Sequence, residues 1–399
     1  MIPLEEARSH VLVRCPSPVT TEVELRRARG LVTAEPIFST AAVPPFDNTA
    51  MDGYAVRSAD TADPPVKLVV VGTLLAGRAS EVIVGPGEAL RIMTGAVIPV
   101  GADAVVMVES TSNSDNGATV TVEGTVAPGN HIRLAGEDLQ IGDQVFAKGT
   151  ILGPGHLGVL ASIGCTQVPV FARPKVGVLS TGDELVDGSA ELAPGQIRDT
   201  NRYALLSLLE ELGVEPIDLG TVPDSERAIE EALLGGVATC DTVLTSGGVS
   251  MGDSDYVKVV LDRIGDMRWM QVAIKPGKPL AFGLVNGVPI FGLPGNPVSS
   301  MVSFELFARP ALRAMMGCSD LDRPRVEAVT DGGFSRRPDG KTHFVRVAVT
   351  YSNGQYRVEP SEKQGSHQLT AMAEADGLAV VPDGDGSLGD DTVEVLLLR

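Results

Sequence analysis

TVLTSGGVSMGDSDYVK, residues 242–258, is the stretch that decides the predicted fold. Thr242–Thr245 are β-branched or apolar and predict a short buried strand. Ser246-Gly247-Gly248 follows, and paired glycines allow a turn with positive φ and a close approach to a ligand. A helix should come next, with Ser254 as its N-cap and an apolar face of Val257, Val260, Leu261 and Ile264.

A strand, a glycine-rich turn and a helix start together form a common anion site, because unpaired N–H groups and the helix dipole attract phosphate. Asp253 and Asp255 in the same loop would repel a phosphate unless a divalent cation lay between them. Taken alone, this loop is equally an ordinary turn before an Asp-rich helix start. The surrounding loops favour the functional interpretation.

From Arg173 onward, strands and helices alternate, a pattern typical of an α/β domain with a parallel sheet. Strands are predicted at 175–180 and 214–219, and Asn286-Gly287 predicts a hairpin turn. Ligands bind such sheets at the carboxyl ends of the strands. Several polar groups follow predicted strands and should meet there: Glu184, Asp224, Ser246–Asp255, Lys275, Lys278 and Gly295–Ser299.

The rest of the chain predicts β-rich structure around this domain. Residues 3–29 predict two helices separated by a proline-marked break, and residues 46–130 predict mostly strands. Two prolines stiffen the loop that presents Asp52, and Thr94 lies in a turn between two strands. After Asp320, alternating apolar and polar residues predict an all-β tail, a small barrel with no chemistry of its own.

The composition excludes several classes of function. Acidic residues outnumber basic ones 51 to 32, and the net charge of −19 disfavours nucleic acid and anionic membranes as partners. Aromatic residues make up only 4%, too few for base-stacking platforms. The four cysteines are widely spaced, and the acidic start MIPLEE is unlike a secretory signal, so we expect a cytoplasmic protein without membrane insertion.

Eight motifs occur in an order and spacing that resemble the molybdopterin molybdenumtransferase family, the MoeA-type proteins that include the C-terminal domain of gephyrin. They are FDNTAMDGYAV (46–56), RIMTGA (91–96), GED (136–138), STGDEL (180–185), DTN (199–201), SGGVSMGDSDY (246–256), KPGKP (275–279) and LPGNPVSS (293–300). The resemblance covers the whole chain. One departure is Gln271, where family members often have a basic residue four positions before the first lysine of KPGKP.

The resemblance implies an elongated, multidomain homodimer of α/β and β-rich domains with a cleft shared by both subunits. Residues 1–45 and 131–172 would form a discontinuous linker and dimerisation domain, and 46–130 a β-rich domain. Residues 173–320 would form the molybdopterin-binding α/β domain, and 321–399 the C-terminal β-barrel.

The implied reaction inserts molybdate into adenylylated molybdopterin and releases AMP with Mg²⁺ present, a step of molybdenum cofactor biosynthesis. By motif match the catalytic residues would be Asp52, Thr94, Asp138, Glu184, Asp224 and Asp255, of which Glu184, Asp224 and Asp255 would hold the metal. The substrate-binding residues would be Ser246, Gly247, Gly248, Ser250, Lys275, Lys278, Gly295, Asn296 and Ser299.

Two other functions stay open at this stage. A gephyrin-like dimeric scaffold would bind a protein peptide, with or without enzyme activity, although the sequence has no low-complexity tail for a multivalent scaffold. An adenylyltransferase acting on molybdopterin would follow from the α/β domain alone. The carboxylate loops upstream of that domain favour metal insertion.

Overall fold

The computed structural model describes residues 1–78, 81–248, 256–387, 389 and 391–399. The chain forms two compact units, which we describe separately. Unit 1 comprises Met1–Thr21, Gly30–Ala34 and Val170–Arg399, and unit 2 comprises Glu22–Arg29 and Glu35–Pro169. The chain changes unit within β1 (Thr20–Glu24), again on either side of residues 30–34, and within β12 (Gln167–Phe171).

Unit 1 is built on a six-stranded sheet with the order β16-β13-β17-β21-β20-β18. The first four strands are parallel, which confirms the predicted α/β pattern, and β20 pairs antiparallel with both of its neighbours, β21 and β18. The hairpin predicted at Asn286-Gly287 is present, with positive φ at both residues. The strands are β13 (Lys175–Thr181), β16 (Glu215–Val222), β17 (Thr242–Ser246), β18 (Asp266–Gln271), β20 (Pro279–Val285) and β21 (Val288–Leu293).

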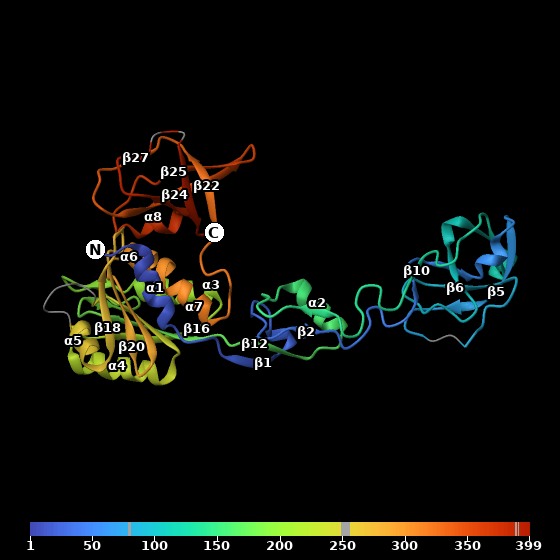
Figure 1. Ribbon diagram of the computed structural model, residues 1–399, viewed down its shortest axis with the longest axis horizontal. Helices are drawn as coiled ribbons and strands as arrows, with labels where there is room; N and C mark the ends of the chain where they lie inside the picture. Colours follow the sequence, from blue (N-terminus) through green and yellow to red (C-terminus); the bar gives the residue numbers. More distant parts are fainter. Residues whose placement is uncertain (79–80, 249–255, 388, 390) are drawn as a thin grey trace. The chain divides into compact units, whose positions relative to one another are not determined.

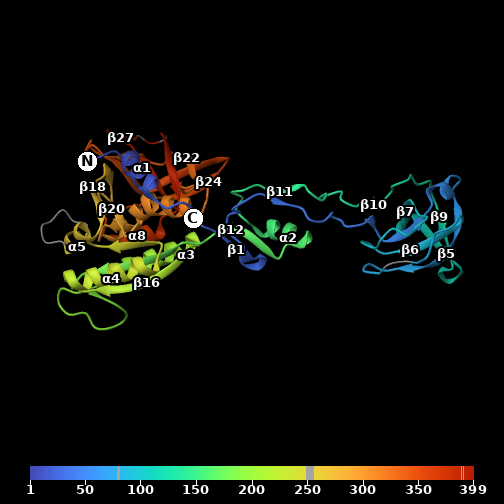
Figure 2. The same ribbon diagram turned by 60° about the horizontal axis from the view of Figure 1, so that its bottom comes forward.

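Helices cover both faces of this sheet because apolar side chains leave it in both directions. Leu179, Val243 and Ile290 pack against α4 (Glu226–Thr239) and α5 (Tyr256–Ile264). Val178, Leu244 and Phe291 belong to a second core, shared with α1, α3, α6 and α7. Figures 1 and 2 both show the blue N-terminal helix against the yellow and orange elements of this domain. The remaining bounds are α1 (Leu4–Arg14), α3 (Asn201–Leu212), α6 (Pro297–Ser303) and α7 (Arg309–Met315), with a π-helical turn at Phe304–Ala308.

The predicted C-terminal barrel is also present. Its strands follow the order β24-β25-β22-β28-β26, and β26 pairs with β24 to close the ring. The strands are β22 (Arg325–Thr330), β24 (Thr342–Ser352), β25 (Gln355–Pro360), β26 (Gly377–Val381) and β28 (Thr392–Leu397). The short helix α8 (Leu369–Glu374) and the small pair β23 (Phe334–Ser335) and β27 (Gly386–Ser387) complete it.

The barrel is joined to the α/β domain by both backbone and side chains. Strand β19 (Ile274–Lys275) pairs in parallel with β24, so that Lys275 lies opposite His343. In the connecting segment, Arg323 forms ion pairs with the buried Glu305 at 2.9 Å and with Glu211 at 2.7 Å. The large core cluster runs from the sheet into the barrel, where it includes Phe344. The barrel and the α/β domain therefore share one core within unit 1 (Figure 1).

Unit 2 contains the β-rich region predicted for residues 46–130. Its six-stranded sheet has the order β7-β4-β6-β5-β9-β8. The strands are β4 (Gly53–Val56), β5 (Val66–Leu74), β6 (Glu88–Ile92), β7 (Ala104–Met107), β8 (Thr111–Ser114) and β9 (Thr119–Val122). The shorter elements are β2 (Ile37–Phe38), β3 (Asn48–Thr49), β10 (Ile132–Arg133), β11 (Gln144–Phe146) and α2 (Pro154–Ser162).

One local prediction is wrong. The second N-terminal helix is instead the strand β1 followed by a single 3-10 turn at Leu25–Arg27. Thr20, Thr21 and Val23 are β-branched residues, which pack well on a pleated surface and lose rotamer freedom in a helix. The acidic and basic residues of 22–29, on which the helix prediction was based, are therefore compatible with a strand and a turn.

The division into four domains stays a prediction, because the structure divides the chain into only two compact units, each of which contains more than one predicted domain. No helix in the described ranges is both long enough and apolar enough to cross a membrane.

We predict that Gly53→Ala destabilises unit 2. A Cβ at this position would lie 2.0 Å from the carbonyl oxygen of Val106 on the neighbouring strand, so the two backbones would have to separate. Such overpacking costs about 1–3 kcal/mol, which urea unfolding would measure. Gly124→Ala is the matched control, because a Cβ there meets nothing within 4 Å. Equal unfolding midpoints for the two variants would contradict this explanation.

Candidate functional site

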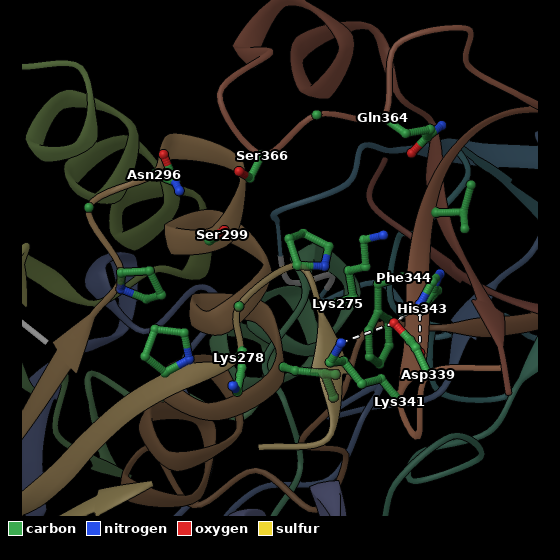
Figure 3. Close-up of a pocket in the computed structure, with 18 of the residues that line it drawn as sticks. Lys275, Lys278, Asn296, Ser299, Asp339, Lys341, His343, Phe344, Gln364 and Ser366 are labelled. Atoms are coloured by element: carbon green, nitrogen blue, oxygen red, sulfur yellow. Dashed lines mark hydrogen bonds and ion pairs between the residues drawn. The ribbon is translucent and has the colours of Figure 1, made fainter. Parts of the chain in front are cut away.

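A cavity of about 1370 Å³ lies in unit 1 between the α/β domain and the barrel. It opens at the carboxyl ends of the parallel strands, where Thr181 ends β13 and Asp224, Gly247 and Gly295 follow β16, β17 and β21. This is the edge at which the sequence predicted the polar groups to converge. Figure 3 shows Asn296 and Ser299 on the α/β side, with Gln364 and Ser366 on the barrel side.

Nine of the predicted site residues line this cavity: Glu184, Asp224, Gly247, Gly248, Lys275, Lys278, Gly295, Asn296 and Ser299. Ser246 lies just behind the wall and is buried. Ser250 and Asp255 lie outside the described residues. Asp52, Thr94 and Asp138 belong to unit 2.

Two glycine-rich turns pack directly on each other at the strand ends. Gly247 and Gly248 have φ of 94° and 69°, as the sequence predicted. A Cβ on Gly247 would lie 3.3 Å from the carbonyl oxygen of Thr181, and one on Gly295 would lie 3.8 Å from Cα of Gly247. The turn at Gly247 therefore depends on glycine for conformation and for close packing, whereas a Cβ on Gly295 would make only an ordinary contact.

Asn201 connects these two turns, and the sequence analysis did not assign it a role in the site. Its Nδ2 donates to Oγ of Ser246 at 2.8 Å and to the carbonyl oxygen of Gly295 at 2.7 Å. In the same DTN motif, Oδ1 of Asp199 accepts from the N–H of Arg202 at 3.2 Å, near the start of α3. Only the spacing of DTN among the family motifs pointed to a role at the site. Ser246 thus positions a loop and does not line the cavity.

Two of the carboxylates that line the cavity, Glu184 and Asp224, come from neighbouring loops of the α/β domain. Oδ1 of Asp183 accepts from the backbone N–H of Asp224 at 3.1 Å, which joins the loop after β13 to the loop after β16. Gly182, with φ of 148°, leaves room for Glu184, whose Oε2 would lie 2.6 Å from a Cβ at that position. Glu184 and Asp224 therefore reach the same cavity from two loops that a hydrogen bond holds together.

Basic side chains line the barrel side of the cavity and add to Lys275 and Lys278. They are Arg336, Arg337, Lys341 and His343. Figure 3 shows Lys275, Lys278 and Lys341 around the same space. The prediction that the tail brings no chemistry is therefore wrong for the walls of this cavity. The basic run RRPDGK at 336–341 could have indicated these residues in the sequence. The alternating apolar and polar pattern of the tail predicted strands only, so the run was not recognised.

Asp339 orders part of this basic wall. It pairs with Nζ of Lys341 at 3.0 Å and with Nε2 of His343 at 3.2 Å. The hydrogen bond from Lys341, followed by that from His343, lowers the pKa of Asp339 to about 2. Burial lowers the pKa of His343, although Asp339 opposes that shift. At neutral pH we therefore expect an ionised Asp339 beside a neutral imidazole.

At the start of the helix after Pro297, fewer backbone N–H groups are available to bind an anion than the position suggests. The N–H of Val298 donates to the carbonyl oxygen of Ser366 at 3.1 Å, so the barrel loop already occupies this donor. Ser299 is buried, with 5% of its surface exposed, and lines the cavity beside it. The lysines and Ser299 remain candidates for anion binding on this side.

In unit 2, Asp52 and Thr94 are joined by hydrogen bonds. Oδ1 of Asp52 accepts from both the N–H and the Oγ1–H of Thr94, each at 2.7 Å. The backbone N–H and then the hydroxyl of Thr94 lower the pKa of Asp52. Asp138 is exposed in the same unit, and its N–H donates to the carbonyl oxygen of Val43 at 2.9 Å.

We predict that Thr94→Val raises the pKa of Asp52 toward its ordinary value, because one of two donors to the carboxylate is lost. Thr94→Ser keeps the hydroxyl and should keep the lowered pKa. A ¹³C NMR titration of the Asp52 carboxyl measures both. Since the folded pKa is lowered, the interaction stabilises the fold fully above the unfolded pKa and is lost as the pH falls through the folded pKa. An unchanged titration in Thr94→Val would show that the hydroxyl does not matter.

We predict that Asn201→Ala loosens both glycine turns. It removes two hydrogen bonds and leaves the acceptors on Ser246 and Gly295 without their donor, at a cost of about 1–3 kcal/mol. Amide hydrogen exchange should become faster at 246–248 and at Gly295 and Asn296. Ser207→Ala, an exposed change on the same helix, should leave exchange there unchanged. Wild-type exchange rates in Asn201→Ala would exclude this bridging role.

Comparison with known protein families accounts for nearly the whole chain. Residues 2–164 match the MoeA N-terminal region (domain I and II), 177–314 match a probable molybdopterin binding domain, and 334–398 match the MoeA C-terminal region (domain IV). These matches agree with the motif resemblance found in the sequence.

Individual relatives align over similar lengths. The molybdopterin molybdenumtransferase of Haemophilus influenzae is 40% identical over 391 residues, which is 97% of this chain and 96% of that protein. The corresponding protein of Bacillus subtilis is 36% identical over 410 residues, covering 100% of this chain and 94% of the relative. The crystal structure of the molybdopterin biosynthesis MoeA protein from Pyrococcus horikoshii has a TM-score of 0.82 and 33% identity, with both chains covered completely. The chain therefore belongs to the MoeA family.

Proposed function

We propose that this chain is a molybdopterin molybdenumtransferase, a transferase of molybdenum cofactor biosynthesis that inserts molybdate into adenylylated molybdopterin and releases AMP. The observation that carries the proposal is the cavity in unit 1. It unites two glycine turns, a pair of carboxylates and a basic wall, and each comes from a different part of the chain. The family match supplies the reaction class.

The charges of the cavity suit the proposed substrates. Molybdate is a dianion, and the other substrate carries a pyrophosphate. A chain with a net charge of −19 repels such anions unless basic groups are concentrated locally. Lys275, Lys278 and Lys341 provide that concentration at the cavity. We propose that Lys275, Lys278 and Ser299 bind oxyanions, with Lys341 as an addition from the barrel.

The described carboxylates also fit the proposed Mg²⁺. Glu184 and Asp224 offer oxygen ligands in one cavity, and Mg²⁺ usually takes one or two carboxylates together with substrate phosphates and water. In the described ranges there is no cluster of three or more metal-binding side chains. Asp255, our third proposed ligand, lies outside those ranges. When bound, the ion would neutralise charge on the pyrophosphate.

The protein's own residues would act by binding and orientation. Glu184 and Asp224 would orient a water toward the adenylyl phosphorus, so that the phosphoanhydride is hydrolysed and AMP leaves. The glycine turns would let the backbone approach the substrate closely. We further propose that the chain is a cytoplasmic homodimer in which Asp52, Thr94 and Asp138 complete the site. The exposed, ionised Asp52 supports such a role.

A gephyrin-like scaffold is not favoured, because the relatives that match nearly the full chain are named as transferases. A protein that receives the finished cofactor remains compatible with the proposed enzyme. A direct assay distinguishes the transferase from the scaffold. AMP release from adenylylated molybdopterin, with Mg²⁺ and with or without molybdate, should depend on molybdate for a transferase. Tight substrate binding without AMP release would favour the scaffold.

We predict that Lys278→Met weakens molybdate-dependent AMP release about 10- to 100-fold, because a charge-assisted hydrogen bond contributes about 1.5–3 kcal/mol. Glu184→Gln should lower the rate and raise the Mg²⁺ concentration needed for half-maximal activity. Lys67→Met is the control, since that exposed lysine pairs with Asp115 in unit 2. Wild-type kinetics in Lys278→Met would remove this lysine from substrate binding.

A further inference from the structure

Asp339 is an acidic residue in the basic wall of the functional cavity. It lies in the loop between β23 and β24 and lines the cavity together with Arg336, Lys341 and His343. Figure 3 shows its carboxylate bonded to both Lys341 and His343. A carboxylate at this place repels the anions that we propose as substrates, so its presence in the wall needs an explanation.

Three side chains and one backbone contact hold Asp339 in place. Oδ1 accepts from Nη2 of Arg336 at 2.9 Å, and Oδ2 accepts from Nζ of Lys341 at 3.0 Å. Nε2 of His343 lies 3.2 Å from both carboxylate oxygens. The N–H of Asp339 donates to Oδ1 of Asp383 at 3.0 Å. The carboxylate is therefore ordered, and it is ionised because the hydrogen bond from Lys341 is the main cause that lowers its pKa to about 2.

The three side-chain partners of Asp339 are not equivalent. Arg336 is buried and also donates to three backbone carbonyl oxygens, so it belongs to the scaffold of the barrel. His343 is expected to be neutral at neutral pH, because burial lowers its pKa. The side chain of Lys341 is 23% exposed and that of Asp339 is 30% exposed, and both line the cavity. A ligand in the cavity can therefore reach this ion pair.

The pairing distinguishes Lys341 from other cations of the cavity. Among the residues that the structure describes, no carboxylate pairs with Lys275, Lys278 or Arg337. An anion gains the full attraction of an unpaired cation. At Lys341 it must share the ammonium group with the Asp339 carboxylate, which repels it. Asp339 therefore weakens the attraction between the barrel side of the cavity and a phosphate group.

We propose that Asp339 is an internal counter-ion that competes with the phosphate groups of the substrate for Lys341 and so sets the affinity of the barrel side of the cavity for anions. The inference rests on the proposed function and deepens it, because it names a residue that weakens anion binding. In the free protein, Asp339 neutralises Lys341 and limits the repulsion among the basic groups of the wall. When a pyrophosphate group binds, the carboxylate favours its release.

The test measures binding of inorganic pyrophosphate to the full-length chain by isothermal titration calorimetry at neutral pH and low ionic strength. Asp339→Asn keeps an acceptor oxygen for Arg336 and replaces Oδ2, the partner of Lys341, by a donor amide. We expect pyrophosphate to bind this variant about 3- to 10-fold more tightly, because a nearby negative charge is removed and Lys341 is released. Glu394→Gln is the matched control. It removes a paired carboxylate of the barrel outside the cavity and should keep the wild-type affinity.

A double-mutant cycle assigns the effect to Lys341. Lys341→Met should weaken pyrophosphate binding only slightly in the wild-type background, but should remove most of the gain in the Asp339→Asn background. The gain should also shrink at high salt, because it is electrostatic. If Asp339 only ordered its loop, its replacement would leave the affinity unchanged or lower it. Thermal unfolding checks that each variant is folded, and Asp339→Ser takes the place of Asp339→Asn if that variant does not fold.

Equal or weaker pyrophosphate binding in the folded variant would overturn the proposal. The absence of measurable binding in both the wild type and Asp339→Asn would overturn it as well. The proposed function fails separately. If the wild type released no AMP but Asp339→Asn bound pyrophosphate more tightly, the transferase would be rejected and the role of Asp339 would stand. If the wild type released AMP and Asp339→Asn bound pyrophosphate as the wild type does, only the role of Asp339 would be rejected.

Discussion

The cavity depends on one contact between domains, the parallel pairing of β19 with β24. This register puts Lys275 opposite His343 and brings the KPGKP loop against the barrel. Without it, the lysines of the α/β domain and the basic residues of the barrel would line separate surfaces. The ion pairs of Arg323 with Glu305 and Glu211, together with that of Arg8 with Asp322 at 2.7 Å, fix the connecting segment in support of that register.

Electrostatics explains why such a contact is needed. An acidic chain can bind anions only where basic groups are gathered, and no single element of unit 1 carries enough of them. The α/β domain supplies Lys275 and Lys278, and the barrel supplies Lys341 and two arginines. Glu184 and Asp224 lie in the same cavity on the loops after β13 and β16, and Asp339 lies on the barrel side, paired with Lys341. A metal ion between the carboxylate pair and a phosphate would remove the repulsion between these negatively charged groups.

The sequence predicted the sheet, the hairpin and the five barrel strands well, because periodicity and turn residues are local signals. It also placed Glu184, Asp224 and the glycine turns at one edge, because parallel strands end together. It could not find Asn201, whose role depends on partners 45–94 residues away in the chain. It also did not find Arg336 and Lys341, because the alternating pattern of the tail does not say which of its loops face another domain.

Three arginines show a common way of holding loops that lack regular structure. Arg202, with a side chain 3% exposed, pairs with Asp187, Asp199 and Asp218 and so orders the loop between Glu184 and Asn201. Arg336, 4% exposed, donates to the carbonyl oxygens of Lys341, Val381 and Pro382.

Arg346 does the same for Ser361–Ser366. A guanidinium suits this task because it offers five donors in a fixed plane, whereas an ammonium offers three on a flexible stem. Each arginine binds several groups of a neighbouring loop. The loops can then keep the glycines that allow close approach to a ligand without the disorder that glycine would otherwise bring. A cavity formed from loops of two domains needs such donors, because no strand or helix fixes those loops directly.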